Sequence, residues 1–295
     1  MTEQATTATT RDPLGLLLLF VGVVSVGAAA ILVRLADAHP LTTSFVRLAL
    51  GGLVLLAGVL LSGRSSPRGP ELKRAVVAGV LLAVHFGLWI GSLSLTTVTA
   101  SVVLVCLQPV FVAVLARVFL RETTSTSVAL GIAIALAGAL LIASDGAAGG
   151  TGSLSGNALA IGGAIAIAVY VLVLRTQRGD VLATSAVVTS TAALVLLPVC
   201  LAAGAPLWAS GPRAAEQAGW LLVLALGPQV VGHTALNAAL KRLPAAVVSG
   251  SILGEPVIAS ILAFLVLNEE PGPKTAAGAV VTLIGLVLLL RKPKT

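Results

Sequence analysis

Long apolar stretches, separated by short polar turns, run through almost the whole chain. Each is close to the roughly 20 residues that a helix needs to cross the hydrocarbon core of a bilayer. The ten stretches fall at 14–33, 42–61, 75–94, 98–119, 126–143, 156–174, 183–203, 217–237, 245–267 and 275–290. The alternating pattern of a membrane barrel is absent, and open strands cannot satisfy their backbone in lipid. The pattern therefore predicts an all-α polytopic membrane protein with ten transmembrane helices.

Composition and charge agree with this prediction. Hydrophobic residues make up 57% of the chain and charged residues 10%, with a mean hydropathy of +1.07. A soluble domain has about a quarter of its residues charged, so a soluble fold is excluded. Ten spans place both termini on one side, together with fourteen lysines and arginines, against three on the other side. This bias predicts a multi-pass protein of the cell (inner) membrane with cytoplasmic termini, and it explains the net charge of +7 without a nucleic-acid partner.

The second half of the chain repeats the first at an offset of 147 residues. Pro109 aligns with Pro256, Glu122 aligns with Glu269, and the gap-free segment 109–138 carries ten identities in thirty positions. Because five spans per repeat is an odd number, the second repeat enters the membrane upside down. Inverted repeats of this kind are typical of transporters. The predicted domains are a disordered cytoplasmic tail over 1–13, a first repeat over 14–145 and an inverted second repeat over 156–291.

The repeated residues resemble a known family. Pro109, Glu122, Gly131 and Gly138, repeated as Pro256, Glu269, Gly278 and Gly285, resemble the EamA family of the drug/metabolite transporter superfamily. The stretch HFGLWIGSLSLTTVTASVVLVCLQPVFVAVL, from His85, is similar to the third and fourth helices of bacterial members, and GHTALNAALKRLPAAVVSGSILGEPV, from Gly232, to their eighth and ninth. The resemblance covers both repeats. It implies a central cavity that opens alternately to either side, and export of amino acids, other metabolites or drugs, with amino-acid export the best-represented role.

Several polar side chains lie near mid-depth, where a charge costs roughly 2.5–3.5 kcal/mol on insertion scales. The predicted substrate-binding residues are His85, Trp89, Gln108, His233, Asn237 and Glu255. The repeat maps Gln108 onto Glu255, as expected of a pseudo-symmetric binding site. His85 and Glu255 are also predicted to carry protons during coupling. Two other readings stay open: each histidine can simply bond a neighbouring helix, and Glu255 can be a buried partner of Arg47 or a protonated carboxyl.

Three prolines predict hinges within the spans. Pro109 and Pro256 lack an amide hydrogen, so the carbonyls of Val105 and Ile252 lose their helical partners. At membrane depth such carbonyls need protein or water, which indicates a cavity or a hinge. Pro228, next to Gln229, predicts a third interruption in the eighth span.

Charged residues nearer the membrane surfaces have gating or structural roles in this scheme. Arg47 lies a turn or two inside the second span, where it can snorkel to the surface, pair with Glu255 or bind a substrate carboxylate. Glu122 and Glu269 end their helices at opposite faces, which predicts helix-end or gating contacts.

The resulting hypothesis is a secondary active transporter of small metabolites, with amino acids favoured and with drug or other metabolite efflux as the alternative. No Walker sequence, HExxH, GxSxG or aspartate cluster is present, so we predict no catalytic residue, metal or cofactor. An intramembrane enzyme, or a channel or sensor, is therefore a remote alternative. The expected partners are a small-molecule substrate, the lipid bilayer and protons as a candidate coupling ion. Substrate identity, transport direction and oligomeric state stay open.

Overall fold

The computed structural model describes residues 12–93, 95, 101, 104–145, 153–268 and 270–291, and all regular secondary structure within them is helical. Nine of these helical segments are long and apolar enough to cross a membrane, and the shorter Gln108–Leu120 occupies the place of the fourth predicted span. The predicted all-α, ten-helix architecture is confirmed.

The helices have the following bounds. In chain order they are α1 (Pro13–Gly27), α2 (Ala29–Ala36), α3 (Pro40–Leu61), α4 (Gly69–Leu93), α6 (Gln108–Leu115), the π-helical η1 (Ala116–Leu120), α7 (Thr126–Asp145), α8 (Leu154–Arg175), α9 (Val181–Ala202), α10 (Ala214–Leu224), the π-helical η2 (Ala225–His233), α11 (Thr234–Leu240), α12 (Ala245–Ser251), the 3-10 turn η3 (Ile252–Gly254), α13 (Glu255–Leu267) and α14 (Pro273–Leu290). Several spans are therefore composite, with α1–α2, α6–η1, α10–η2–α11 and α12–η3–α13 each forming one of them.

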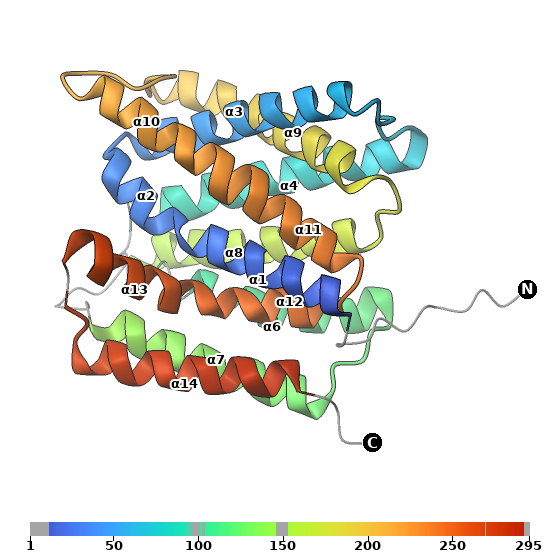
Figure 1. Cartoon of the computed structure of the whole chain (residues 1–295), viewed down its shortest axis with the longest axis vertical. Coiled ribbons are helices and arrows are strands. Elements are labelled where there is room, and N and C mark those ends of the chain that lie inside the picture. The colour runs from blue at the N-terminus through green and yellow to red at the C-terminus, as the bar shows by residue number, and fades with distance from the viewer. Residues whose placement is uncertain are drawn as a thin grey trace, which may run out of the picture.

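Helix packing shows the inverted repeat directly. α4 packs along α8, and the repeat-related counterpart of this pair is the packing of α1 and α2 along α10, η2 and α11. α3 packs on α9 and α7 on α14, so these two pairs each join equivalent helices of the two repeats (Figure 1). Local geometry repeats as well: Arg121 and Asn268, 147 residues apart, both end their helices in the left-handed conformation with φ of 55°.

The loops sort onto two faces. Figure 1 shows α1 beginning and α14 ending on the same side of the molecule, which we call the termini face. Arg242 Nη1, between α11 and α12, donates to Asp12 Oδ2 at 2.6 Å on that face. This hydrogen bond lowers the pKa of the Asp12 carboxyl below its ordinary value. On the opposite face Arg213 forms a salt bridge of 3.4 Å with Asp37. The loops predicted to share a side thus do so, while their orientation relative to the cytoplasm stays a prediction.

The tightest contact between the repeats is a glycine seam between α7 and α14. A Cβ placed on Gly138 would lie 2.4 Å from the Thr282 nitrogen, and one on Gly285 would lie 2.3 Å from the Ala135 nitrogen. Gly131 and Gly278 make equally close approaches to backbone atoms. Lipid tails are as apolar as the helices, so the hydrophobic effect does not drive helix association within a membrane. Close van der Waals packing of this kind drives it instead. These four glycines therefore serve close packing between the two repeats.

Candidate functional site

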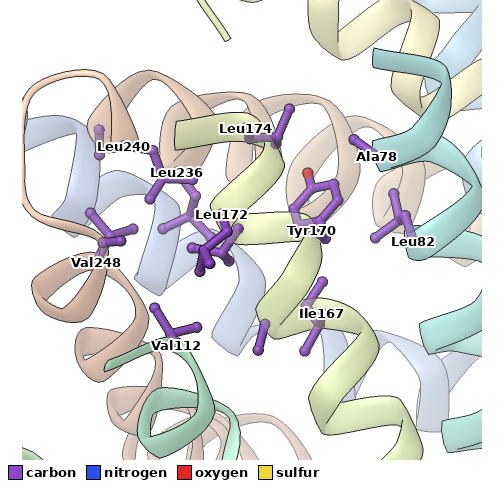
Figure 2. Packing of buried hydrophobic residues seen from close by; sticks show 14 of the residues in the cluster. Ala78, Leu82, Val112, Ile167, Tyr170, Leu172, Leu174, Leu236, Leu240 and Val248 are labelled. Carbon is purple, nitrogen blue, oxygen red and sulfur yellow. The ribbon is translucent and has the colours of Figure 1, made fainter. Parts of the chain in front are cut away.

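An apolar layer of buried side chains lies in the part of the molecule toward the termini face. It joins both repeats, and Figure 2 shows part of it: Ala78 and Leu82 of α4, Val112 of α6, Ile167, Tyr170, Leu172 and Leu174 of α8, Leu236 and Leu240 of α11 and Val248 of α12. α4 and α12 begin at the termini face, and α11 ends there. Leu82 precedes His85, Leu236 follows His233, and Val248 precedes Glu255. The apolar layer therefore separates the predicted site residues from the termini face.

On α4, His85, Phe86 and Trp89 form an aromatic shelf. The imidazole of His85 stacks on the indole of Trp89, with centroids 6.2 Å apart and planes 11° apart, and Phe86 lies 5.2 Å from His85. His85 Nδ1 is 2.9 Å from the carbonyl oxygen of Gly163 on α8. Because a carbonyl only accepts, Nδ1 donates, and Nε2 is left as an acceptor in the neutral ring. The hydrogen bond to a neighbouring helix therefore exists, and Nε2 has no hydrogen-bond partner among the residues that the structure describes.

Arg47 of α3 is buried beside this shelf. Its side chain does not snorkel, since only 5% of the residue is exposed. Arg47 Nε donates to Gln229 Oε1 at 3.2 Å, and Gln229 Nε2 donates to Thr189 Oγ1 at 3.3 Å. The guanidinium carbon lies 4.9 Å from the centroid of Phe86, in cation–π contact. Gln229 thus holds one edge of the guanidinium and Phe86 one face.

The helix breaks at the prolines bring Gln108 and Glu255 to corresponding positions. Gln108 begins α6 immediately before Pro109, and Glu255 begins α13 immediately before Pro256. The amide of Glu255 donates to the carbonyl of Ile252, so the predicted loss of that carbonyl's α-helical partner is met by a 3-10 turn. Gln108 is buried, and Glu255 is half-buried. The breaks are present as expected, although their role as hinges stays a prediction.

The eighth span is interrupted around Pro228 by the π-helical η2. π-Helical turns are rare and are frequent at functional sites. His233 ends η2 half-buried and interacts electrostatically with Arg47 and His85. Asn237, one turn further, has both ends of its side-chain amide hydrogen-bonded within the protein. Its Oδ1 accepts from Tyr170 at 3.1 Å, and its Nδ2 donates to Ser185 Oγ at 3.1 Å.

We use the name central polar cluster for Arg47, His85, Gln229, His233 and Glu255. Arg47 interacts electrostatically with Glu255 and with both histidines. Among the described residues Arg47 forms no salt bridge, so Glu255 is a neighbouring charge rather than a contact partner. The cluster draws on α3, α4, η2 and α13, and thus on both repeats.

At the termini face, the carboxylate of Glu122 accepts two hydrogen bonds. Its Oε1 accepts from Arg175 Nε of α8 at 2.6 Å, and its Oε2 accepts from the amide of Ala245 at the start of α12 at 3.2 Å. Arg175 also donates to the carbonyl of Leu240. One carboxylate of the first repeat therefore ties two helices of the second. Its repeat mate Glu269 lies outside the described residues.

Phe86 and Thr189 are contacts of the site that the sequence did not indicate. Phe86 follows His85 in an apolar span, where nothing marks it as the partner of an arginine. Thr189 sits one turn after Ser185 on α9, and both are buried. The only signal for Thr189 in the sequence is the helical spacing of small hydroxyl residues inside a span, and such residues are also common in ordinary helix packing.

A helical membrane protein built from two inverted repeats, with a polar cluster drawn from both repeats at its centre, has the architecture of a transporter. The chain belongs to the EamA-like transporter family, whose sequence profile matches residues 13–144 and 154–291. Family membership thus covers both repeats, as the resemblance implied.

Individual relatives agree with this assignment. The chain is 29% identical over 259 residues to a probable terminal-alkyne amino-acid exporter of Streptantibioticus cattleyicolor, covering 85% of this chain and 84% of that protein. It is 25% identical to the uncharacterized transporter YwfM of Bacillus subtilis, covering 88% and 86%. A solved crystal structure superposes with a TM-score of 0.82 at 19% identity, covering 93% and 95% of the two chains, which shows the common fold.

Gly51 of α3 packs closely against Gln229 of the central polar cluster. A Cβ on Gly51 would lie 2.7 Å from Gln229 Cγ, whereas one on Gly58 of the same helix meets only Leu182 at 3.6 Å. Gly51→Ala should displace Gln229 from Arg47, and loss of that hydrogen bond, about 0.5–1.5 kcal/mol, should weaken substrate binding by roughly 3- to 10-fold. Gly58→Ala is the control and should leave binding unchanged. Equal affinities of the two variants in transport assays would contradict the supporting role of Gly51.

Proposed function

We propose that this transporter is a secondary active exporter of small metabolites, and of amino acids in particular, in the cell (inner) membrane with both termini in the cytoplasm. The observation that carries the proposal is the central polar cluster, which draws on both repeats and in which Arg47, His85 and Gln229 are buried. A buried cation, a carboxyl group, two imidazoles and an amide are expensive in a membrane, so they are expected to serve a polar cargo. The aromatic shelf beside them suits an apolar portion of the same cargo.

The relative named as a probable terminal-alkyne amino-acid exporter, 29% identical to this chain, supports the cargo class. Neither a catalytic group nor a cofactor enters the proposal, because alternating access needs only binding and a conformational change. The energy source is proposed to be a proton gradient, with Glu255 and His85 as the groups that gain and lose the proton. Both lie in the cluster, and both interact electrostatically with Arg47.

Counterflow in proteoliposomes tests the function. Vesicles preloaded with one unlabelled amino acid at a time should accumulate the labelled form by saturable exchange. His85→Ala and Trp89→Ala should each reduce this exchange at least tenfold, because each removes part of the proposed contact surface. Trp208→Ala is the matched control, since Trp208 lies exposed in the loop between α9 and α10 and should not affect exchange.

The outcome also separates the candidate cargoes. If folded wild-type protein exchanges drugs or other metabolites but no amino acid, the amino-acid assignment is wrong and the general transport function stands. The same vesicles, loaded with a pH-sensitive dye, report the number of protons moved per substrate molecule. This ratio should fall to zero in Glu255→Gln, and an unchanged ratio would remove Glu255 from coupling.

A further inference from the structure

The guanidinium of Arg47 is incompletely paired. Its Nε is bonded to Gln229 and its face is covered by Phe86, but Nη2 is buried and has no hydrogen-bond partner among the described residues. The residue is 5% exposed, and no described carboxylate lies within salt-bridge distance of it. A buried cation with an unsatisfied donor is strongly destabilising unless an anion reaches it. Gln229 also holds the guanidinium in one orientation, which prepares it to bind a planar anion such as a carboxylate.

A second, opposite charge lies within electrostatic range. Glu255 interacts with Arg47 without contacting it, and no hydrogen bond of its carboxyl group is found among the described residues. The guanidinium and the carboxyl group are therefore near each other without forming a salt bridge, so one can bind an anion and the other a cation. The indole nitrogen of Trp89 is a further buried donor, and no residue in the described part of the chain accepts from it. This donor lies on the aromatic shelf that also covers the guanidinium through Phe86.

We propose that the central polar cluster is a two-ended site for zwitterions, in which Arg47 binds the carboxylate of an α-amino acid and Glu255 binds its ammonium group. The aromatic shelf then contacts the side chain of the amino acid. This inference rests on the proposed amino-acid transport and deepens it, because it assigns each charge of the cargo to one residue. Arg47 is accordingly a specificity-determining residue rather than a purely structural one. A cargo with only one of the two charges leaves the other residue unpaired, and unpaired buried charges are the basis of strong discrimination.

Competition in the counterflow assay tests the assignment. The probes are L-alanine, L-leucine and L-phenylalanine, each with its amide, which lacks the carboxylate, and its N-acetyl derivative, which lacks the ammonium group. A charge-assisted hydrogen bond corresponds to a factor of roughly 10–100 in affinity. In wild-type protein the free amino acid should therefore compete at least tenfold better than either derivative.

The two variants should lose different halves of this discrimination. In Arg47→Gln the amino acid and its amide should compete within about threefold of each other, while rejection of the N-acetyl derivative persists. In Glu255→Gln the amino acid and its N-acetyl derivative should compete within about threefold of each other, while rejection of the amide persists. A structural role predicts a common loss of activity without this reciprocal change. Arg47→Lys keeps the positive charge but lacks the planar guanidinium, so it should retain part of the discrimination. This variant replaces Arg47→Gln in the test if Arg47→Gln does not fold. Arg64→Gln, which removes an arginine at the termini face, is the control.

The possible outcomes separate this inference from the proposed function. If wild-type protein exchanges amino acids but accepts their amides equally well, the two-ended site is wrong and the transport function stands. The same conclusion follows if folded Arg47→Gln, or folded Arg47→Lys, discriminates as wild type does. If wild-type protein exchanges no amino acid at all, both the amino-acid assignment and the two-ended site are wrong, and exchange of drugs or other metabolites then tests the general transport function.

Discussion

A Gly138→Leu variant is expected to lose the folded state. Gly138 lies in the glycine seam, where even a Cβ would meet the backbone nitrogen of Thr282 at 2.4 Å and the carbonyl of Gly278 at 2.6 Å. Backbone atoms of a packed helix cannot move aside as a flexible side chain can, so α7 and α14 must separate along their contact. Overpacking in a core typically costs 1–3 kcal/mol, and we expect more than about 3 kcal/mol here.

Fluorescence-detected size exclusion and thermal melting in detergent measure this effect. Gly138→Leu should give little monodisperse protein, and Gly138→Ala should give protein with a clearly lowered melting temperature. Gly219→Leu is the matched control, because Gly219 is exposed on α10 and nothing lies within 4 Å of its Cβ position. If Gly138→Leu and Gly219→Leu had the same melting temperature, the glycine seam would not be the contact that holds the two repeats together.

A Glu122→Ala variant is expected to loosen the termini face. The carboxylate of Glu122 ties Arg175 and the amide of Ala245, and its removal leaves both donors without this partner. Hydrogen bonds to charged groups contribute about 1.5–3 kcal/mol, and the side chains here are 16% and 26% exposed, so solvent screening reduces the effect to roughly 1–2 kcal/mol. That corresponds to a 5- to 30-fold larger population of states open at this face.

The labelling rate of a single cysteine detects this opening. Val248→Cys, in a background without Cys106 and Cys200, places a thiol in the apolar layer about one turn beyond Ala245. Its reaction with a water-soluble maleimide should accelerate 5- to 30-fold in Glu122→Ala. Glu216→Ala removes a carboxylate from an ion pair on the opposite face and should leave the rate unchanged. Equal rates in all three proteins would show that Glu122 does not hold this face closed.

The sequence predicted the fold well because the signals for it are local or repeated. The apolar stretches have the length needed to cross a bilayer, and the match between the two halves at an offset of 147 residues indicates a second copy of the first repeat. Helix ends were less accurate: α4 begins at Gly69 rather than near residue 75, because its first turns carry Glu71, Lys73 and Arg74 outside the apolar part. Hydropathy reports depth in the membrane, whereas a helix continues until its backbone hydrogen bonding stops.

The candidate site was predictable only in part, because polarity shows which side chains are unusual but not which ones meet. His85, Trp89 and Glu255 stood out as polar or aromatic groups at mid-depth. That Arg47 reaches Gln229, 182 positions away in the chain, depends on how α3 packs against η2, and no local pattern encodes that contact. Asn237 was a predicted substrate-binding residue, yet Tyr170 and Ser185 are hydrogen-bonded to its amide.

The glycine seam between α7 and α14 also bears on how such a chain can arise. The seam pairs a surface with its own repeat-related copy, as the interface of a two-fold symmetric dimer does. Two separately made five-helix proteins could therefore join through it, provided that one of them inserted upside down. Such an ancestor would have to insert in both orientations, which requires nearly balanced charges on its loops. Fusion into one chain fixes the two orientations covalently, and each repeat is then free to acquire the one-sided distribution of lysine and arginine seen here.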